Sequence, residues 1–354
     1  MPDHSATIDH WDSDPWNTDE IVFWLQHPKV QQRLALKESG RPDGNWIAHT
    51  LQTWLPDATP VERCLSLGCG RGRIERDLAA RQAFVTCDAF DLSAESIADA
   101  SHAALAAGFT HINYAVADID HIQLAPGRYD VVWIVSAAHH FSRLEHVFAQ
   151  VAQALKPDGL VVLYEYVGAN RFQFPARQRQ VIEACLQLLP MSYRLLPAPA
   201  LSATGGAIAD AARPRRKKAA WVARRVLDKV REGTLLSTAQ RLWRKQQALH
   251  SGQRPVKEIA VPTERSVIAV DPSEAIRADE IVSILETQFD ILENRPLGGS
   301  ILQFLLADIA GNFQDAAGEQ WLDILFQIED ALLASGDLTS DFACIVAKPK
   351  HHLV

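Results

Sequence analysis

The 354-residue sequence has no apolar run of about 18 residues, the length that a helix needs to cross a membrane. Its first twenty residues are acidic and contain Trp11 and Trp16, and they lack the basic-then-apolar order of a secretory signal. Cysteine is scarce, and no CxxC or Cys/His ligand spacing connects the five cysteines. We therefore expect a cytoplasmic protein with reduced thiols, no disulfide framework and no zinc site.

The composition is that of a folded protein. Hydrophobic residues make up 47% and charged residues 22% of the chain, which is typical of soluble globular domains and argues against disorder. Single α/β domains usually run to about 150–250 residues, so a chain of this length can form one core with a large insertion. We expect one elaborated domain.

Short apolar runs alternate with helical patterns from about Glu62 onward, which predicts βαβ units and a parallel sheet with helices on both faces. The seven expected strands are Arg63–Leu67, Val85–Asp91, Ile112–Ala117, Tyr129–Val135, Gly159–Val167, Phe289–Glu293 and Asp341–Lys348. The expected helices are Arg73–Ala80, Ala94–Ala107, Leu144–Leu155, Arg177–Leu189, Ile301–Ile309, Glu319–Ser335 and one over Asp271–Leu285 that opens with the capping sequence Asp-Pro-Ser-Glu. Lys156–Gly159 is expected to form a turn. The predicted fold class is α/β with a doubly wound, Rossmann-like sheet.

A glycine-rich turn follows the first strand in the sequence Leu65-Ser-Leu-Gly-Cys-Gly-Arg-Gly72. Glycines let the backbone turn tightly and pass close to a ligand, and the free N–H groups of the next helix favour an anionic or electron-rich group. Taken alone, the turn also fits a dinucleotide site or a chance glycine cluster. A dinucleotide site more often has Gly-x-Gly-x-x-Gly, and Arg73 occupies the position of that third glycine.

Two aspartates end the second and third strands. Asp91 lies 23 residues after Gly68, where a carboxylate can accept hydrogen bonds from both hydroxyls of a ribose. Asp118 precedes Ile119 after the third strand, where a carboxylate and a backbone N–H can bind the amino edge of an adenine. Each aspartate on its own is typical of a surface or helix-capping residue.

Together, the Gly-x-Gly-x-Gly spacing and the two acidic strand ends resemble the class I S-adenosylmethionine-dependent methyltransferases over Glu62–Val167. The resemblance implies S-adenosyl-L-methionine as the cofactor, and it implies a sixth strand and an antiparallel seventh strand at the end of the chain. The residues expected at the cofactor are Gly68, Cys69, Gly70 and Gly72 for the methionine part, Asp91 for the ribose, Asp118 with Ile119 for the adenine, and in addition Leu92 and Ser136.

Three C-terminal stretches, Asp271–Arg277, Pro296–Gly299 and Gly311–Phe313, are similar to a bacterial subgroup of these methyltransferases linked to saccharide or natural-product biosynthesis. That similarity implies a small polar molecule or a sugar as the acceptor, and we expect methylation on oxygen. Enzymes that methylate nitrogen in DNA or in glutamine amides usually carry Asn/Asp-Pro-Pro-Tyr/Phe after the fourth strand, where this chain has Ser-Ala-Ala-His-His. Nucleic acid is therefore not an expected partner.

Methyl transfer to a hydroxyl requires a group that takes the acceptor's proton. His140 and His139 follow the fourth strand, and imidazole is the side chain best suited to proton transfer at neutral pH. Glu165 is a second candidate, because the end of the fifth strand faces the same crevice if the alternation runs that way. The histidines fit a packing or capping role equally well. No aspartate pair or His/Asp cluster at metal spacing follows the fourth strand, so no metal ion is expected.

Four segments are expected along the chain: an N-terminal helical cap over the cofactor end of the sheet in residues 1–58, a cofactor-binding core in 59–196, a basic helical insertion or lid in 197–265, and the rest of the core in 266–354. Residues 213–245 contain 12 Lys/Arg and two acidic residues, a formal charge of +10 in a chain of −8. Basic amphipathic helices of this kind fit a solvated surface, a docking lid for a phosphorylated or carrier-linked acceptor, or contact with an anionic membrane.

The sequence thus predicts an S-adenosylmethionine-dependent O-methyltransferase with a small polar or saccharide acceptor. The alternative is a non-catalytic module that binds S-adenosylmethionine and engages a membrane or a protein partner through the basic insertion. The intact glycine turn and Asp91 favour the enzyme, because a degenerate module would more often have lost them. No oligomeric state is predicted.

Overall fold

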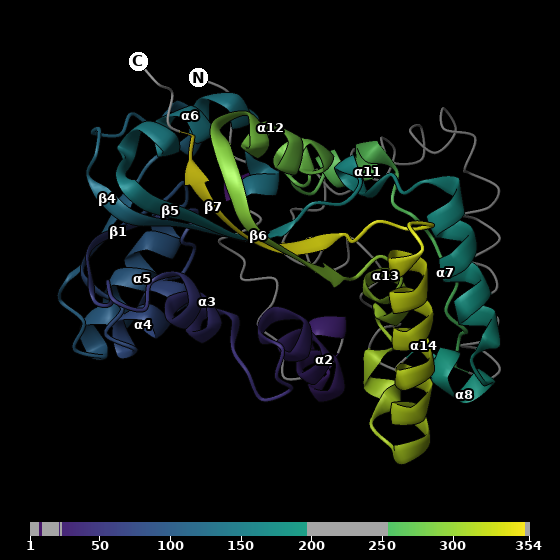
Figure 1. Ribbon diagram of the computed structural model, residues 1–354. Coiled ribbons are helices and arrows are strands. Elements are labelled where there is room, and N and C mark those ends of the chain that lie inside the picture. The colour runs from purple at the N-terminus through teal and green to yellow at the C-terminus, as the bar shows by residue number, and fades with distance from the viewer. Residues whose placement is uncertain (1–6, 9–20, 22, 197–253, 351–354) are drawn as a thin grey trace.

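A computed structural model describes residues 7–8, 21, 23–196 and 254–350 of the protein (Figure 1). Its centre is one seven-stranded sheet with the order β3-β2-β1-β4-β5-β7-β6. The strands are β1 (Val61–Leu67), β2 (Phe84–Asp91), β3 (Ile112–Val116), β4 (Tyr129–Val135), β5 (Leu155–Tyr166), β6 (Phe289–Gly298) and β7 (Phe342–Pro349). Strands β1 to β5 are parallel, and β7 runs antiparallel to its neighbours β5 and β6. The prediction of a Rossmann-like sheet with an antiparallel last strand is confirmed.

Helices cover both faces of the sheet (Figure 1). One face carries α6 (Leu144–Ala154) and α12 (Ile281–Gln288), and the other carries α3 (Trp46–Trp54), α4 (Arg73–Ala80) and α5 (Ala94–Ala106). Alternate residues of β4 therefore enter different cores: Val132 and Ile134 pack on the α6 side, and Val131 and Trp133 pack on the α3 side. Burial on both faces explains why β4 is apolar at nearly every position.

A second group of helices has a core of its own beside the sheet (Figure 1). Its members are α2 (Pro28–Ser39), α7 (Ala176–Leu188), α8 (Met191–Arg194), α13 (Leu302–Leu306) and α14 (Ala316–Ala334). The fully buried Glu329 of α14 links them, because it pairs with Arg33 of α2 at 2.7 Å and accepts a hydrogen bond from the backbone N–H of Ile301 at 2.8 Å. Residues from both ends of the chain thus share one core.

The N-terminal helix α3 packs on one face of the sheet. Trp46 of α3 packs on Trp133 and Tyr164, with ring centroids 5.9 and 5.1 Å apart, so α3 lies on the face of the sheet and not across its end. Two described residues of this region lie at the end of the sheet: Thr7 donates a hydrogen bond to Asp271 at 2.7 Å, and the ring of Trp24 packs on Phe342 of β7 with centroids 5.4 Å apart. α3 is therefore not part of a cap, and the predicted cap of residues 1–58 otherwise stays a prediction, because much of its first part lies outside the described residues.

Two local predictions are wrong. The Asp-Pro-Ser-Glu sequence does not open a helix, because Asp271 accepts hydrogen bonds from the backbone N–H and the hydroxyl of Ser273 at 2.8 and 2.7 Å within a loop, and α12 begins only at Ile281. The Lys156–Gly159 stretch belongs to β5, where it forms a bulge between the pairs Tyr129–Leu155 and Val131–Leu160.

The basic stretch 213–245 lies outside the described residues, so its amphipathic helices stay a prediction. The described flanks of the insertion meet each other: the backbone N–H of Leu196 donates to Pro255 at 2.9 Å, and that of Lys257 donates to Arg194 at 2.7 Å. Within the ranges that the structure describes, no helix combines the length and the apolar character needed to cross a membrane.

Candidate active site

The glycine turn lies between the carboxyl end of β1 and the start of α4, as predicted. Gly68, Gly70 and Gly72 have φ angles of 73°, 51° and 72°, a region that favours glycine. A Cβ at Gly68 would overlap the Cβ of Ala137, and one at Gly72 would lie 2.8 Å from the Cβ of Ala100. At Gly70 a Cβ would meet no atom within 4 Å. The turn is therefore packed tightly at both ends and open in its middle.

Asp91 holds this turn in shape from the end of β2. One carboxylate oxygen accepts the backbone N–H of Gly70 at 2.8 Å, and the other accepts that of Ser93 at 2.9 Å. The carboxylate of Asp91 therefore lies beside the open middle of the turn at Gly70. Leu92 follows it, half-buried.

The other predicted cofactor residues lie at the ends of β1, β3 and β4. The carboxylate of Asp118 accepts the backbone N–H of Asp120 at 3.1 Å and lies 2.9 Å from the Nδ1 of His121, while Ile119 is buried. Ser136 is exposed at the end of β4 with a φ of 50°, an uncommon conformation for a residue other than glycine. Burial raises the pKa of the Cys69 thiol, which is therefore neutral. The assignment of each residue to a part of the cofactor stays a prediction.

Glu165 lies beneath the histidines and does not face a crevice. Its side chain is 0% exposed. One oxygen accepts the backbone N–H groups of Ala137 and Ala138 at 2.8 and 2.7 Å, and the other accepts from Tyr166 at 2.8 Å and is bonded to the Nδ1 of His139. The prediction of Glu165 as a proton acceptor for a substrate is not supported by this geometry, because its acceptor positions are filled. Glu165 is a positioning residue for His139.

His139 carries a strongly perturbed pKa. Burial lowers the pKa of its imidazole, but the negative charges of Glu165, Glu274 and Asp271 raise it by more than burial lowers it. The resulting pKa is about 9. The Nε2 atom of His139 lies 3.8 Å from a carboxylate oxygen of Glu274. In the structure as it stands, His139 is thus held between two carboxylates.

His140 packs beside His139, with ring centroids 4.2 Å apart. Its Nδ1 atom lies 2.9 Å from the hydroxyl of Ser273 and 3.6 Å from a carboxylate oxygen of Asp271. Asp271 itself is almost fully buried and also accepts the hydroxyl of Thr7. The two histidines after β4 are therefore surrounded by three carboxylates, one from β5 and two from the 271–277 loop.

Sequence reasoning missed Asp271, Ser273 and Glu274 as members of this site. They lie more than 130 residues beyond the histidines, and their sequence predicts a helix start. The loop is held open by Arg171, whose guanidinium donates to the backbone oxygens of Pro272 and Glu274 at 2.7 Å each. Arg171 is buried with a φ of 52°, and its guanidinium is engaged by the backbone of this loop. No local signal in the sequence marks these residues as part of the site, because only the tertiary fold brings the loop to the histidines.

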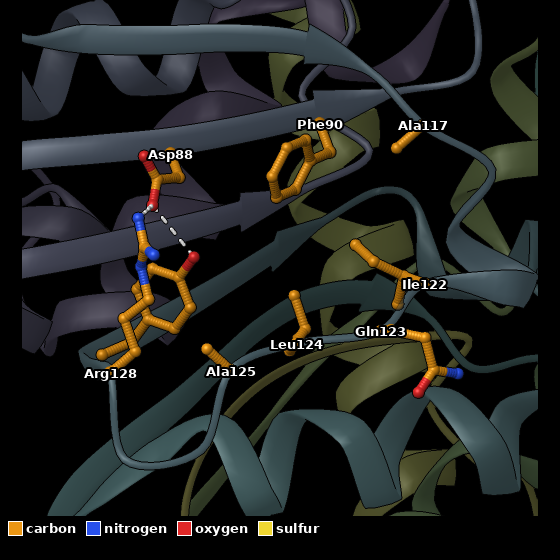
Figure 2. Close-up of a pocket in the computed structure, with 9 residues that line it drawn as sticks. Asp88, Phe90, Ala117, Ile122, Gln123, Leu124, Ala125 and Arg128 are labelled. Carbon is orange, nitrogen blue, oxygen red and sulfur yellow. Dashed lines mark hydrogen bonds and ion pairs between the residues drawn. The ribbon is translucent and has the colours of Figure 1, made fainter.

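A separate hollow of about 440 Å³ lies beside β2 (Figure 2). Its floor is polar: the guanidinium of Arg128 and the hydroxyl of Tyr129 both donate to one oxygen of Asp88 at 2.9 Å. Figure 2 shows Phe90 and Ala117 at its other end, toward the carboxyl edge of the sheet. None of the predicted cofactor or catalytic residues lines it.

Residues 65–163 match the family model described as a methyltransferase domain. A sterol 24-C-methyltransferase of Candida albicans is 27% identical over 113 residues, which are 31% of this chain and 29% of that protein. A malonyl-[acyl-carrier protein] O-methyltransferase of Enterobacter lignolyticus is 33% identical over 138 residues, 39% of this chain and 47% of that protein. The chain thus spans less than half of the length of these curated relatives.

Solved structures resemble this chain over part of its length. An S-adenosylmethionine-dependent methyltransferase from Mesorhizobium loti is 31% identical, with 35% of this chain and 55% of that chain covered and a TM-score of 0.30. The resemblance predicted over Glu62–Val167 agrees with the family match, so residues 65–163 form a methyltransferase domain. The strand order is that of the predicted Rossmann-like sheet.

Proposed function

We propose that the whole chain is an S-adenosylmethionine-dependent methyltransferase that methylates a hydroxyl of a small polar molecule or a sugar in the cytoplasm. The observation that carries the proposal is the contact between the glycine turn and the end of β4. Gly68 packs so closely on Ala137 that a Cβ would not fit between them, and His139 and His140 follow directly in the next turn. The residues that we assign to the methyl donor and the histidine that we assign to the acceptor's proton therefore follow two neighbouring strands, β1 and β4.

The residues of the glycine turn fit the cofactor. Gly70 borders open space, and α4 begins at Arg73 without a side-chain cap, so the amides of its first turn favour an anionic group such as the cofactor's carboxylate. We assign the ribose hydroxyls to Asp91, whose carboxylate is bonded to the N–H of Gly70 beside this open space. When bound, the cofactor supplies an electrophilic methyl group on a sulfonium. The protein's contribution is to hold and orient the two reactants.

We assign the acceptor's proton to His140. Its side chain is 15% exposed against 10% for His139, which is clamped to Glu165. Asp271 and Ser273 orient the ring and stabilise the imidazolium that forms. With the cofactor bound, His140 would accept the hydroxyl proton as the acceptor oxygen takes the methyl group, and Asp271 and Ser273 would hold the ring for that proton transfer.

The choice of an oxygen acceptor agrees with one relative, which is named as an O-methyltransferase of a carrier-linked malonyl group. The basic stretch 213–245, with its formal charge of +10, favours an anionic or carrier-linked acceptor over a neutral one. The same stretch could also bring the protein to an anionic membrane surface, which is our second candidate for its role.

Isothermal titration calorimetry with S-adenosylmethionine and S-adenosylhomocysteine tests the proposal first. We expect one site per chain with micromolar affinity for both compounds. Acceptors are then screened by formation of S-adenosylhomocysteine, with sugar phosphates, nucleotide sugars and acyl-carrier conjugates compared with neutral sugars. Failure of both compounds to bind contradicts the proposal, and binding without transfer to any acceptor favours the non-catalytic module.

A further inference from the structure

The cluster after β4 has the composition of a metal site. His139, His140 and Glu274 each place one ligand atom so that all three lie within 4.8 Å of one another. Ligands about 2.1 Å from a tetrahedral metal lie about 3.4 Å apart, so small side-chain rotations bring the three atoms into range. Two imidazoles and one carboxylate, with positions left for water or substrate, form a common ligand set for catalytic zinc.

Both histidines already have the supporting contacts that metal ligands require. A metal-binding histidine usually directs its other ring nitrogen to a carboxylate or a similar group, which fixes the ring and raises its basicity. The Nδ1 of His139 is bonded to Glu165, and the Nδ1 of His140 lies 2.9 Å from the Ser273 hydroxyl and 3.6 Å from Asp271. Glu165 and Asp271 are 0% and 1% exposed, so these contacts are built into the core.

The local charge also favours a bound cation. The carboxylates of Glu165, Asp271 and Glu274 lie around the two rings. A divalent ion bound between the rings would lie close to these negative charges, which would stabilise it.

We propose that His139, His140 and Glu274 bind a divalent transition-metal ion, of which Zn²⁺ is the best fit. Imidazole ligands favour such ions over Mg²⁺, which prefers an all-oxygen shell. The inference rests on the proposed function for its role and changes one step of it. The ion would bind the acceptor oxygen at the end of β4 and lower the pKa of its hydroxyl, so that with the ion bound the proton would leave to water and His140 would be a ligand in place of the proton acceptor assigned above. This adds a metal where the sequence predicted none.

Metal binding is measured without any acceptor. The full-length protein is freed of metal with EDTA and titrated with ZnCl₂, CoCl₂ and MgCl₂. We expect one Zn²⁺ per chain, Mg²⁺ binding at least about a hundredfold weaker, and visible absorption bands of Co²⁺ bound to nitrogen and oxygen ligands. No stoichiometric binding of Zn²⁺ and no Co²⁺ bands would overturn the inference.

Three variants separate this site from adventitious binding. Glu274→Gln should weaken Zn²⁺ binding at least tenfold, and the His139→Gln/His140→Gln/Glu274→Gln variant should abolish it. The matched control is His351→Gln/His352→Gln, which removes the other adjacent histidine pair in the sequence and should leave binding unchanged. Zn²⁺ that stays bound to the triple variant, or is lost from the control, contradicts the site.

The affinity for S-adenosylhomocysteine is measured on the same samples and reports both on folding and on the proposed function. If S-adenosylhomocysteine binds and Zn²⁺ does not, the metal inference fails and the methyltransferase proposal stands. If Zn²⁺ binds at the cluster and S-adenosylhomocysteine does not, the metal site stands and the proposed function fails. If the triple variant does not fold, the Co²⁺ spectrum of the natural sequence and the Glu274→Gln variant still decide.

Discussion

Glu165 and His139 form a buried carboxylate–imidazole pair, and backbone amides of the segment after β4 donate hydrogen bonds to the same carboxylate. The same carboxylate bonds to His139 and to three backbone N–H groups, at Ala137, Ala138 and Tyr166. One side chain of β5 therefore fixes both the path of the chain after β4 and the orientation of the first histidine.

Replacing Glu165 with Gln should cost far more stability than replacing a surface glutamate. The amide cannot accept all four hydrogen bonds, and it leaves His139 beside Glu274 without its main partner, so we expect a loss of about 3 kcal/mol in the free energy of unfolding. The control is Glu145→Gln, which removes an exposed ion pair with Arg277 and should cost less than about 1 kcal/mol. Urea unfolding at pH 7.5 measures both, and equal losses would contradict the role given to Glu165.

Asp91→Ala should weaken the binding of S-adenosylmethionine and S-adenosylhomocysteine at least tenfold. The change removes the ribose acceptor and also frees the N–H groups of Gly70 and Ser93. Calorimetry of both compounds gives the affinities, and Asp57→Ala, at an exposed turn, serves as the control that should bind normally. An unchanged affinity of the Asp91 variant would remove the ribose assignment.

His140→Ala should slow methyl transfer by about 10² while cofactor affinity stays within a factor of two. Its ring packs on His139 and lies beside Ser273 and Asp271, whereas the ribose and the methionine part of the cofactor are assigned to Asp91 and the glycine turn. Single-turnover rates with the acceptor found in the screen, together with calorimetry, separate the two effects. His102→Ala, exposed on α5, should change neither quantity. Full activity in the His140 variant would exclude His140 as the proton acceptor and would mean that the protein acts by orienting the two reactants.

The core of the fold could be predicted because its signals are local. The limits of β4 and α4 agree with the predicted Tyr129–Val135 and Arg73–Ala80. A strand that is buried on both faces appears in the sequence as a continuous apolar run, and a helix that follows a glycine turn begins where the glycines end. The glycine turn and Asp91 were found for the same reason. The 271–277 loop could not be predicted in this way, because Arg171, about a hundred residues earlier, fixes its conformation. The Asp-Pro-Ser-Glu pattern occurs both in such loops and at the starts of helices.

Glu165 shows the same limit inside a correctly predicted strand. Alternation along β5 places it near the histidines, but it cannot say whether a side chain at a strand end faces solvent or is covered. Two backbone amides of the segment after β4, at Ala137 and Ala138, and the amide of Tyr166 in β5 cover it here. The sequence therefore predicted the neighbourhood of the site, and the tertiary contacts decided the chemical role.

Glu75 gives the stability of this protein a pH dependence that can be checked directly. The side chain is 1% exposed beneath the glycine turn, and one of its oxygens accepts the hydroxyl of Ser66 at 2.5 Å. Burial raises the pKa of this carboxyl from 4.5 to about 7. The folded state therefore keeps the proton on Glu75 between pH 4.5 and 7, whereas the unfolded chain releases it.

The sign of the effect follows from this difference in bound protons. Below pH 4.5 Glu75 is protonated in the folded and in the unfolded state, so its ionisation does not affect the free energy of unfolding. As the pH rises to about 7, the free energy of unfolding falls by roughly 3 kcal/mol, at about 1.4 kcal/mol for each unit of raised pKa. Above pH 7 this loss stays constant. Glu75→Gln removes the ionisation, so the variant should gain on the natural protein by about that amount between pH 4.5 and 8. Urea unfolding at these two pH values measures the gain, and Glu95→Gln, exposed on α5, should show no such change. A difference between variant and natural protein that is the same at both pH values would mean that Glu75 titrates normally, and that water or a cation reaches it under the turn.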